Sequence, residues 1–288
     1  MEAFILQSLN GLTSAMYIWM VAAGLTIAFG VLGILNFAHG SLYMLGGFFA
    51  FSFYHILGIG FVLSVILAVI GVGVCGFLLE RFFIRPIYGE SIEIQLILTF
   101  AFVLIFDNAT RYVWGTAFTI STIPDFLDGS IPIMSRTFAI YNLFIIGVGV
   151  AVFAIIWLIL DKTWWGKAVR VTASDREMAN AIGINARTLL TKTFIFASAV
   201  AAVGGAVSIP SRVITSGIGA SVIVDAFIVV VIGSLGNLKG AFVAALILGL
   251  VSSYSQLYLP GGVHRFVPFL VMIIVLTIRP QGIFGAAK

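Results

Sequence analysis

Charge is what this sequence has least of. Only 9% of its 288 residues are charged, and residues 3–79 contain no Asp, Glu, Lys or Arg. A soluble domain carries roughly 25% charged residues. With 61% hydrophobic residues and a mean hydropathy of +1.18, the chain cannot keep its apolar surface out of water by folding on itself. The sequence therefore predicts a membrane protein that crosses the bilayer with several α-helices.

Several kinds of chemistry also lack the residues that they need. The single cysteine, Cys75, excludes an intramolecular disulfide and a cysteine-rich metal site. No G-x-x-x-x-G-K-[ST] phosphate loop is present, which excludes the usual mode of ATP hydrolysis. The three histidines, His39, His55 and His264, do not have metal-ligand spacing, and no serine occupies a G-x-S-x-G motif. We therefore expect no catalytic residue, metal site or cofactor, and we expect that the chain is not an enzyme.

The apolar runs predict an all-α fold that forms one membrane domain over residues 1–288. A span needs about 20 apolar residues, which gives eight or nine transmembrane helices. If the segment after Asn36 is a re-entrant half-helix, the number is eight. The net charge of +4 lies mostly in one loop, so it indicates orientation and not nucleic-acid binding. The predicted spans are 12–35, 39–56, 59–79, 94–113, 138–160, 190–209, 222–236, 241–258 and 264–278.

The loop over residues 161–192 holds 6 of the 15 Lys and Arg residues. Basic loops face the cytoplasm, and this orientation also places the C-terminus in the cytoplasm. Within the loop, Ser174 followed by Glu177 has the spacing of a capping box. Asp175 suits the positive end of a helix dipole, and Gly183 can take the left-handed conformation that ends a helix. The sequence thus predicts one short helix over residues 174–183.

This short helix has a small apolar face, made of Met178 and Ile182. Arg176 and Glu177 lie beside that face and are expected to form a polar rim around it. A capped helix between two membrane spans offers a surface for docking a soluble partner. The alternative is an ordinary cytoplasmic loop that is basic only because of the positive-inside rule.

Residues 24–47 differ from a simple span, because they contain six glycines and are interrupted by Asn36, His39 and Ser41. Polar groups at membrane depth usually face a cavity, and transporters build central sites at broken helices. We expect these three residues to frame a translocation path, with Gly40 allowing close backbone approach. The alternative is close packing through small residues, with Asn36 and His39 as helix caps.

A further candidate for the substrate path is Asp225, in the apolar run VIVDAFIVVV. Its carboxylate could attract the amino group of a zwitterion. The alternative is a position at the outer membrane interface, in water.

Five motifs follow one another along the chain: GLTIAFGVLGILNFAHGSLYMLGG at 24–47, ERFFIRPIYG at 80–89, ASDREMANAIGIN at 173–185, GSLGNLKGAF at 233–242 and RPQGIFG at 279–285. Together they resemble the motifs of the LivH-type permeases of branched-chain amino acid ABC importers. This resemblance implies a bacterial or archaeal inner-membrane protein in contact with lipid. It also implies three kinds of partner: a second, LivM-like permease subunit, two cytoplasmic ATPases, and an external solute-binding protein. In that family a coupling helix fits a groove on the ATPase, which carries over to residues 174–183.

The function that this resemblance implies is import of branched-chain or other neutral amino acids. Relatives also carry urea, short amides or other small polar solutes, so these remain alternatives. A stand-alone secondary transporter is a further rival, and it predicts acidic ion sites deep in the spans. Only Asp107 and Asp225 are candidates, and both lie near span ends. An intramembrane enzyme would need a nucleophile and base, or a metal site, and neither is found.

Overall fold

The computed structural model describes residues 2–116, 121–133, 136–260 and 262–285, and the chain is mostly helical. Within these described residues, six helical segments are long and apolar enough to cross a membrane, which confirms a polytopic all-α protein. They are α1 (Glu2–Leu32), α3 with its continuation (Phe61–Ile87), α4 (Ile92–Trp114), α5 (Ile140–Lys162), α8 (Ala186–Ser208) and α10 (Leu238–Tyr258). Two shorter apolar helical segments are α9 (Ile218–Gly233) and Val263–Ile278, which contains α11 (Val267–Ile278). Whether eight or nine segments cross the bilayer stays a prediction.

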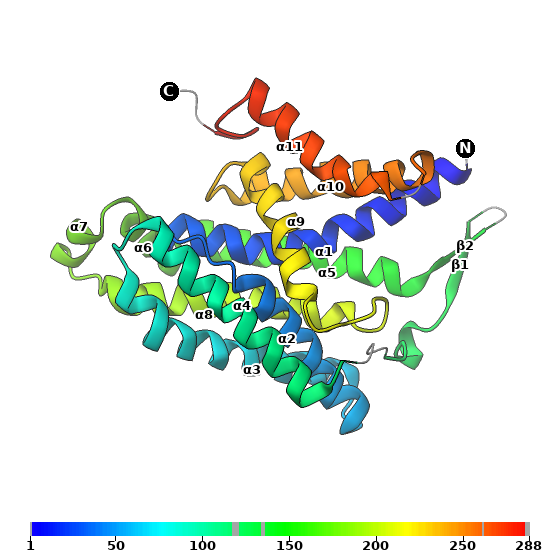
Figure 1. Cartoon of the computed structure of the whole chain (residues 1–288), viewed down its shortest axis with the longest axis horizontal. Coiled ribbons are helices and arrows are strands. Elements are labelled where there is room, and N and C mark those ends of the chain that lie inside the picture. Colours follow the sequence, from blue (N-terminus) through cyan, green and yellow to red (C-terminus); the bar gives the residue numbers. More distant parts are fainter. Residues whose placement is uncertain (1, 117–120, 134–135, 261, 286–288) are drawn as a thin grey trace.

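Helix α1 runs through the middle of the molecule and packs against α5, α8, α9 and α10 (Figure 1). A helix that is apolar all round is expected to be buried on every side. Trp19 of α1 is fully buried and meets Phe153 of α5 and Phe242 of α10 in edge-to-face ring contacts. The first span was predicted over 12–35, whereas the helix begins at Glu2 and ends at Leu32.

The predicted break after α1 is present. Gly33 takes a left-handed conformation with a φ of 70°, which ends α1. The chain re-enters helix at α2 (His39–Phe51), which continues as the π-helical turn η1 (Ser52–Ile56). The His39 ring lies directly against Gly24 of α1, eight residues before the end of that helix. Residues 33–38 therefore fold back into the helical layer, and α2 begins beside the last third of α1.

Small residues allow α2 to approach its neighbours closely. A Cβ atom on Gly40 would lie 2.1 Å from the backbone oxygen of Gly219 in α9. A Cβ atom on Gly46 would lie 2.6 Å from the backbone oxygen of Ala202 in α8. Only small side chains permit such backbone contact between membrane helices. The glycines of this segment thus have a packing role, whatever else they do.

The two connections with most polar residues contain structure that the sequence reading treated as loop. The loop expected over 114–137 includes an antiparallel hairpin of β1 (Ser130–Ile133) and β2 (Arg136–Ala139). The basic loop contains two helices, α6 (Trp164–Ser174) and α7 (Arg176–Ala181). Helices α6 and α7 lie at one end of the molecule, whereas the N-terminus and the hairpin lie at the opposite end (Figure 1).

Candidate functional site

The polar residues of the broken segment are buried inside the protein. Asn36, His39 and Ser41 are at most 2% exposed. The amide atoms of Asn36 and the hydroxyl of Ser41 have no hydrogen-bond partner among the described residues, whereas the His39 ring lies near the backbone carbonyl of Val21. A buried polar group without a partner costs roughly 1–3 kcal/mol. Asn36 and Ser41 therefore each carry such a cost in this conformation.

The structure leaves no room for a solute beside these residues. Asn36 lines a cavity of about 10 Å³ together with apolar residues of α1 and α9. One water molecule needs about 10–15 Å³ of space measured in this way, so this space holds at most about one water and no amino acid. The rings of Phe37 and Phe227 stack beside it with their centroids 6.4 Å apart. If a path runs here, the conformation described is closed at this level.

Asp225 does not join this cluster. Ile223 and Phe227 of α9 line the small cavity beside Asn36, and Asp225 lies between them in sequence, on another face of the helix. Asp225 instead lines a cavity of about 540 Å³, here called the outer cavity. The structure therefore brings Asn36, His39, Gly40 and Ser41 together and places Asp225 apart from them. The outer cavity is lined by Ser14, Ile18, Arg212, Ser221, Val224, Asp225, Leu248, Ser252, Gln256, His264, Arg265, Pro268 and Phe269.

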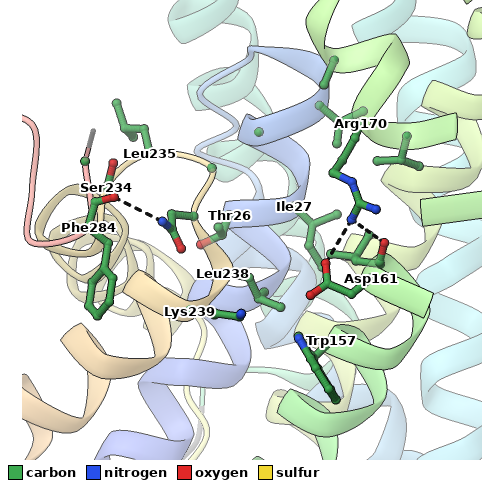
Figure 2. A pocket seen from close by; sticks show the side chains of 18 residues that line it. Thr26, Ile27, Trp157, Asp161, Arg170, Ser234, Leu235, Leu238, Lys239 and Phe284 are labelled. Atoms are coloured by element: carbon green, nitrogen blue, oxygen red, sulfur yellow. Dashed lines mark hydrogen bonds and ion pairs between the residues drawn. The ribbon is translucent and has the colours of Figure 1, made fainter. Parts of the chain in front are cut away.

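A second large cavity, of about 480 Å³, lies where α1, α5 and α6 meet the turn between α9 and α10 (Figure 2). Lys239 and an ion pair between Asp161 and Arg170, 3.0 Å apart, line this inner cavity. Phe284 also lines it, so the C-terminal segment lies at the same end of the molecule as α6. Sequence reasoning did not find this cavity, because its lining comes from five segments that are far apart in the chain.

The short helix of the basic loop begins one residue later than predicted. Ser174 is the last residue of α6, and Asp175 is the N-cap of α7. One carboxylate oxygen of Asp175 accepts hydrogen bonds from the backbone N–H groups of Glu177 and Met178, at 2.9 and 3.0 Å. The prediction of Ser174 as the N-cap was wrong, because α6 extends through that residue. Gly183 has a φ of 88°, which confirms the left-handed end of this helical turn.

Met178 of α7 and Ile182, which follows the helix, point away from the protein, whereas Arg176 points into it. Met178 and Ile182 are 58% and 61% exposed. The Arg176 guanidinium donates a hydrogen bond of 2.7 Å to the carbonyl of Leu32, the last residue of α1, and lies 5.6 Å from the centre of the Tyr88 ring. Arg176 is thus not part of a rim around the apolar face. It connects α7 to the residue that precedes the broken segment.

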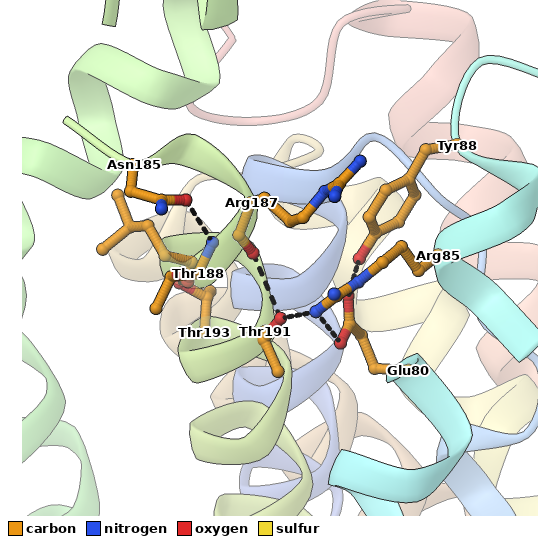
Figure 3. A network of polar contacts seen from close by, with 9 residues as sticks. Glu80, Arg85, Tyr88, Asn185, Arg187, Thr188, Thr191 and Thr193 are labelled. Atoms are coloured by element: carbon orange, nitrogen blue, oxygen red, sulfur yellow. Dashed lines mark hydrogen bonds and ion pairs between the residues drawn. The ribbon is translucent and has the colours of Figure 1, made fainter. Parts of the chain in front are cut away.

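Behind this contact lies a network of buried polar groups around Glu80 (Figure 3). Glu80, in η2 (Glu80–Ile84), is fully buried and is paired through both oxygens with Arg85 of η3 (Arg85–Ile87), at 3.1 and 3.2 Å. Arg85 also donates to Thr191 of α8, and the Tyr88 hydroxyl donates to Glu80 at 2.9 Å. Burial, with the negative charge of Glu80, raises the pKa of Tyr88, so its hydroxyl stays protonated. The network fixes the end of the α3 segment to α8.

Comparisons with known proteins agree on one family. The family model described as "Branched-chain amino acid transport system / permease component" matches residues 7–276. The high-affinity branched-chain amino acid transport system permease protein BraD of Pseudomonas aeruginosa is 29% identical, over 98% of this chain and 96% of its own length. The corresponding permease protein LivH of Escherichia coli K12 is 27% identical, over 98% and 96%. A probable LivH of the archaeon Methanocaldococcus jannaschii is 26% identical, over 92% and 88%.

Among solved structures, the chain is similar to PsaBC from Streptococcus pneumoniae in complex with Fab. The TM-score is 0.53 at 16% sequence identity, and the likeness covers 96% of this chain and 92% of that one. At this identity the likeness concerns the fold alone. It supports one continuous arrangement of helices over nearly the whole chain.

Proposed function

Because this chain belongs to the permease-component family of branched-chain amino acid transport systems, we propose that it is the LivH-type membrane subunit of an ATP-driven importer for branched-chain or other neutral amino acids. The match over residues 7–276 carries the proposal. The absence of a phosphate loop from the sequence supports it, since ATP must then be hydrolysed by another subunit. The proposed partners are a LivM-like second permease, two cytoplasmic ATPases and an external solute-binding protein.

The proposed site is the inner membrane of a bacterium or archaeon, with the α6–α7 end in the cytoplasm. The positive-inside rule supports this orientation, since residues 161–192 hold 6 of the 15 Lys and Arg residues. Phe284 lines the inner cavity beside α6, so the C-terminus is then cytoplasmic as well. The outer cavity and Asp225 open on the opposite side, where substrate arrives. We regard residues 1–288 as one transmembrane domain.

In this proposal Asn36, His39, Gly40 and Ser41 frame the translocation path in a closed state. The buried polar side-chain atoms of Asn36 and Ser41 have no partner among the described residues. Water or substrate would supply those partners when the segment opens, which removes the energetic cost of the closed state. The break at Gly33 supports this role, because a segment outside regular helix can move without breaking a hydrogen-bond ladder.

The ATPase is proposed to dock on residues 174–183, with Met178 and Ile182 in its groove. A helix of six residues is not stable alone, so α7 depends on its Asp175 cap and on its contacts. One of those contacts runs from Arg176 to the carbonyl of Leu32. Movement of α7 on the ATPase would therefore be transmitted to the residue before the broken segment.

The test is transport by defined components in lipid vesicles. This chain alone should show no solute uptake and no ATP-dependent transport. Together with its second permease, the ATPases and the loaded binding protein, it should import leucine at the expense of ATP. Robust leucine uptake by the pure single chain would contradict the proposal, and so would an assembled complex that imports urea but no neutral amino acid.

A further inference from the structure

The outer cavity carries side chains of both charge signs that are not neutralised by one another. Asp225, in the second turn of α9, and Arg212, in the connection before that helix, both line it. The described residues form three ion pairs, and neither Asp225 nor Arg212 takes part in any of them. The two groups attract each other electrostatically, but they do not come within ion-pair distance. Each therefore keeps its charge available to a third group.

Arg212 is held in place while its N–H groups stay free. Its guanidinium lies 4.1 Å from the centre of the Tyr17 ring, a cation–π contact. The Tyr17 hydroxyl forms a hydrogen bond with Ser211, which fixes the ring that supports the guanidinium. No side-chain hydrogen bond of Arg212 forms within the described part of the chain. A positioned guanidinium with free donors is suited to a carboxylate, which it binds through two parallel hydrogen bonds.

The remaining wall of the cavity suits a small side chain. Ile18, Val224, Leu248 and Phe269 supply apolar surface, and Ser221, Ser252 and Gln256 supply neutral polar groups. His264 and a second arginine, Arg265, also line the cavity, so its positive charge exceeds its negative charge. Ligand sites for small molecules have volumes of about 300–1,000 Å³ and are mostly apolar, with a few polar groups that fix orientation. The outer cavity, at about 540 Å³, has this size and composition. Charged groups at membrane depth also usually face a cavity and mark a substrate pathway.

We propose that the outer cavity binds an α-amino acid as a zwitterion, with Arg212 on its carboxylate and Asp225 on its ammonium group. The apolar residues Ile18, Val224 and Leu248 then accept an aliphatic side chain. This inference rests on the proposed function and narrows it: urea and short amides have no pair of opposite charges and would leave both protein charges unpaired. An aliphatic amine would pair only with Asp225, and a fatty acid would pair only with Arg212.

The experiment measures binding to the purified permease–ATPase complex without the binding protein, so that only the membrane site selects the ligand. The probes are leucine, 4-methylpentanoate, which lacks the ammonium group, and 3-methylbutylamine, which lacks the carboxylate. Wild type should bind leucine at least about tenfold more tightly than either analogue. Asp225→Asn should weaken leucine binding about tenfold or more and leave 4-methylpentanoate binding nearly unchanged. Arg212→Gln should weaken leucine and leave 3-methylbutylamine nearly unchanged.

Asp161→Asn is the matched control, because Asp161 lies in the inner cavity and should not affect these affinities. Arg212→Lys keeps the charge but loses the two-pronged geometry, so it should bind leucine with intermediate affinity. Unchanged leucine binding in both Asp225→Asn and Arg212→Gln would overturn the inference, and so would equal binding of leucine and both analogues by wild type. Leucine import by the complete wild-type system tests the proposed function separately. If that import persists while the two variants bind as wild type does, only the zwitterion site is wrong.

Discussion

Replacing Asn36 with leucine should stabilise the permease and stop transport. The two side chains have nearly the same shape, and Asn36 is 2% exposed, with neither amide atom hydrogen-bonded to a described residue. Removing an unsatisfied buried amide recovers roughly 1–3 kcal/mol. For a chain of this size, each kcal/mol shifts Tm by about 2–4 °C, so Tm should rise by roughly 2–12 °C. The same change removes the polar atoms that we expect to meet water or substrate in the open state.

The measurements are the Tm of the detergent-purified complex and leucine uptake by the complex in vesicles. Thr99→Val is the matched control, because Thr99 is equally buried but its hydroxyl donates to the carbonyl of Gln95 at 2.9 Å. That variant loses a bond that is made in this structure, so its Tm should not rise. A fall in Tm for Asn36→Leu to the level of Thr99→Val would refute the energetic argument. Uptake at the wild-type rate by Asn36→Leu would refute its role in the path.

Three further outcomes concern the α6–α7 end of the molecule. The double change Met178→Asp and Ile182→Asp places charge in the proposed ATPase groove, at a cost of several kcal/mol, so the ATPases should fail to co-purify with a folded permease. Arg176→Gln should leave the ATPases bound but reduce the leucine moved per ATP hydrolysed, since it removes the charged bond to the end of α1, worth roughly 1.5–3 kcal/mol. Arg85→Leu leaves the Glu80 carboxylate buried and unpaired and should destabilise the subunit by about 3–5 kcal/mol, measured as a fall in Tm.

Two variants separate these effects from general damage to the α6–α7 end. Arg170→Gln removes an exposed ion pair with Asp161 and a hydrogen bond of 2.6 Å to the carbonyl of Leu160 in α5. Neither contact joins α7 to α1, so this variant should keep the wild-type amount of leucine moved per ATP hydrolysed. The double change Glu80→Gln and Arg85→Leu removes both charges and should cost less than Arg85→Leu alone. ATPases that stay fully bound to the Met178 and Ile182 double variant would mean that coupling lies elsewhere. If Arg176→Gln moves as much leucine per ATP hydrolysed as wild type, the contact to Leu32 does not couple α7 to the broken segment.

The helices were predictable because long apolar runs have few other structures available in a membrane. The chain between them was less predictable. The hairpin of β1 and β2 depends on pairing between two segments, and the predicted all-α fold included no strands. Glycine conformations were easier to predict, because the need for a positive φ depends on the neighbouring residues alone. The left-handed Gly183 is an example.

The local parts of the candidate site were also predictable, but its tertiary contacts were not. Burial of Asn36 and His39 followed from polar residues inside an apolar run. The direction of Arg176 did not, because its partner Leu32 lies 144 residues away in the sequence. The position of Arg212 in the wall of the outer cavity was also not predicted, because most of the other residues of that wall are distant in the sequence. One signal was available, namely an arginine shortly before a helix that itself carries Asp225.

The exposure of Met178 and Ile182 also affects the subunit before it is assembled. Both side chains lie on the connection between α5 and α8, and they are 58% and 61% exposed. Burying an aliphatic side chain of this size is worth about 1.5–3 kcal/mol. In the proposed complex the ATPase covers them, so a copy without its ATPase would expose an apolar surface to chaperones, proteases and other unassembled copies. On this proposal, synthesis of the chain without the ATPase should lead to its degradation.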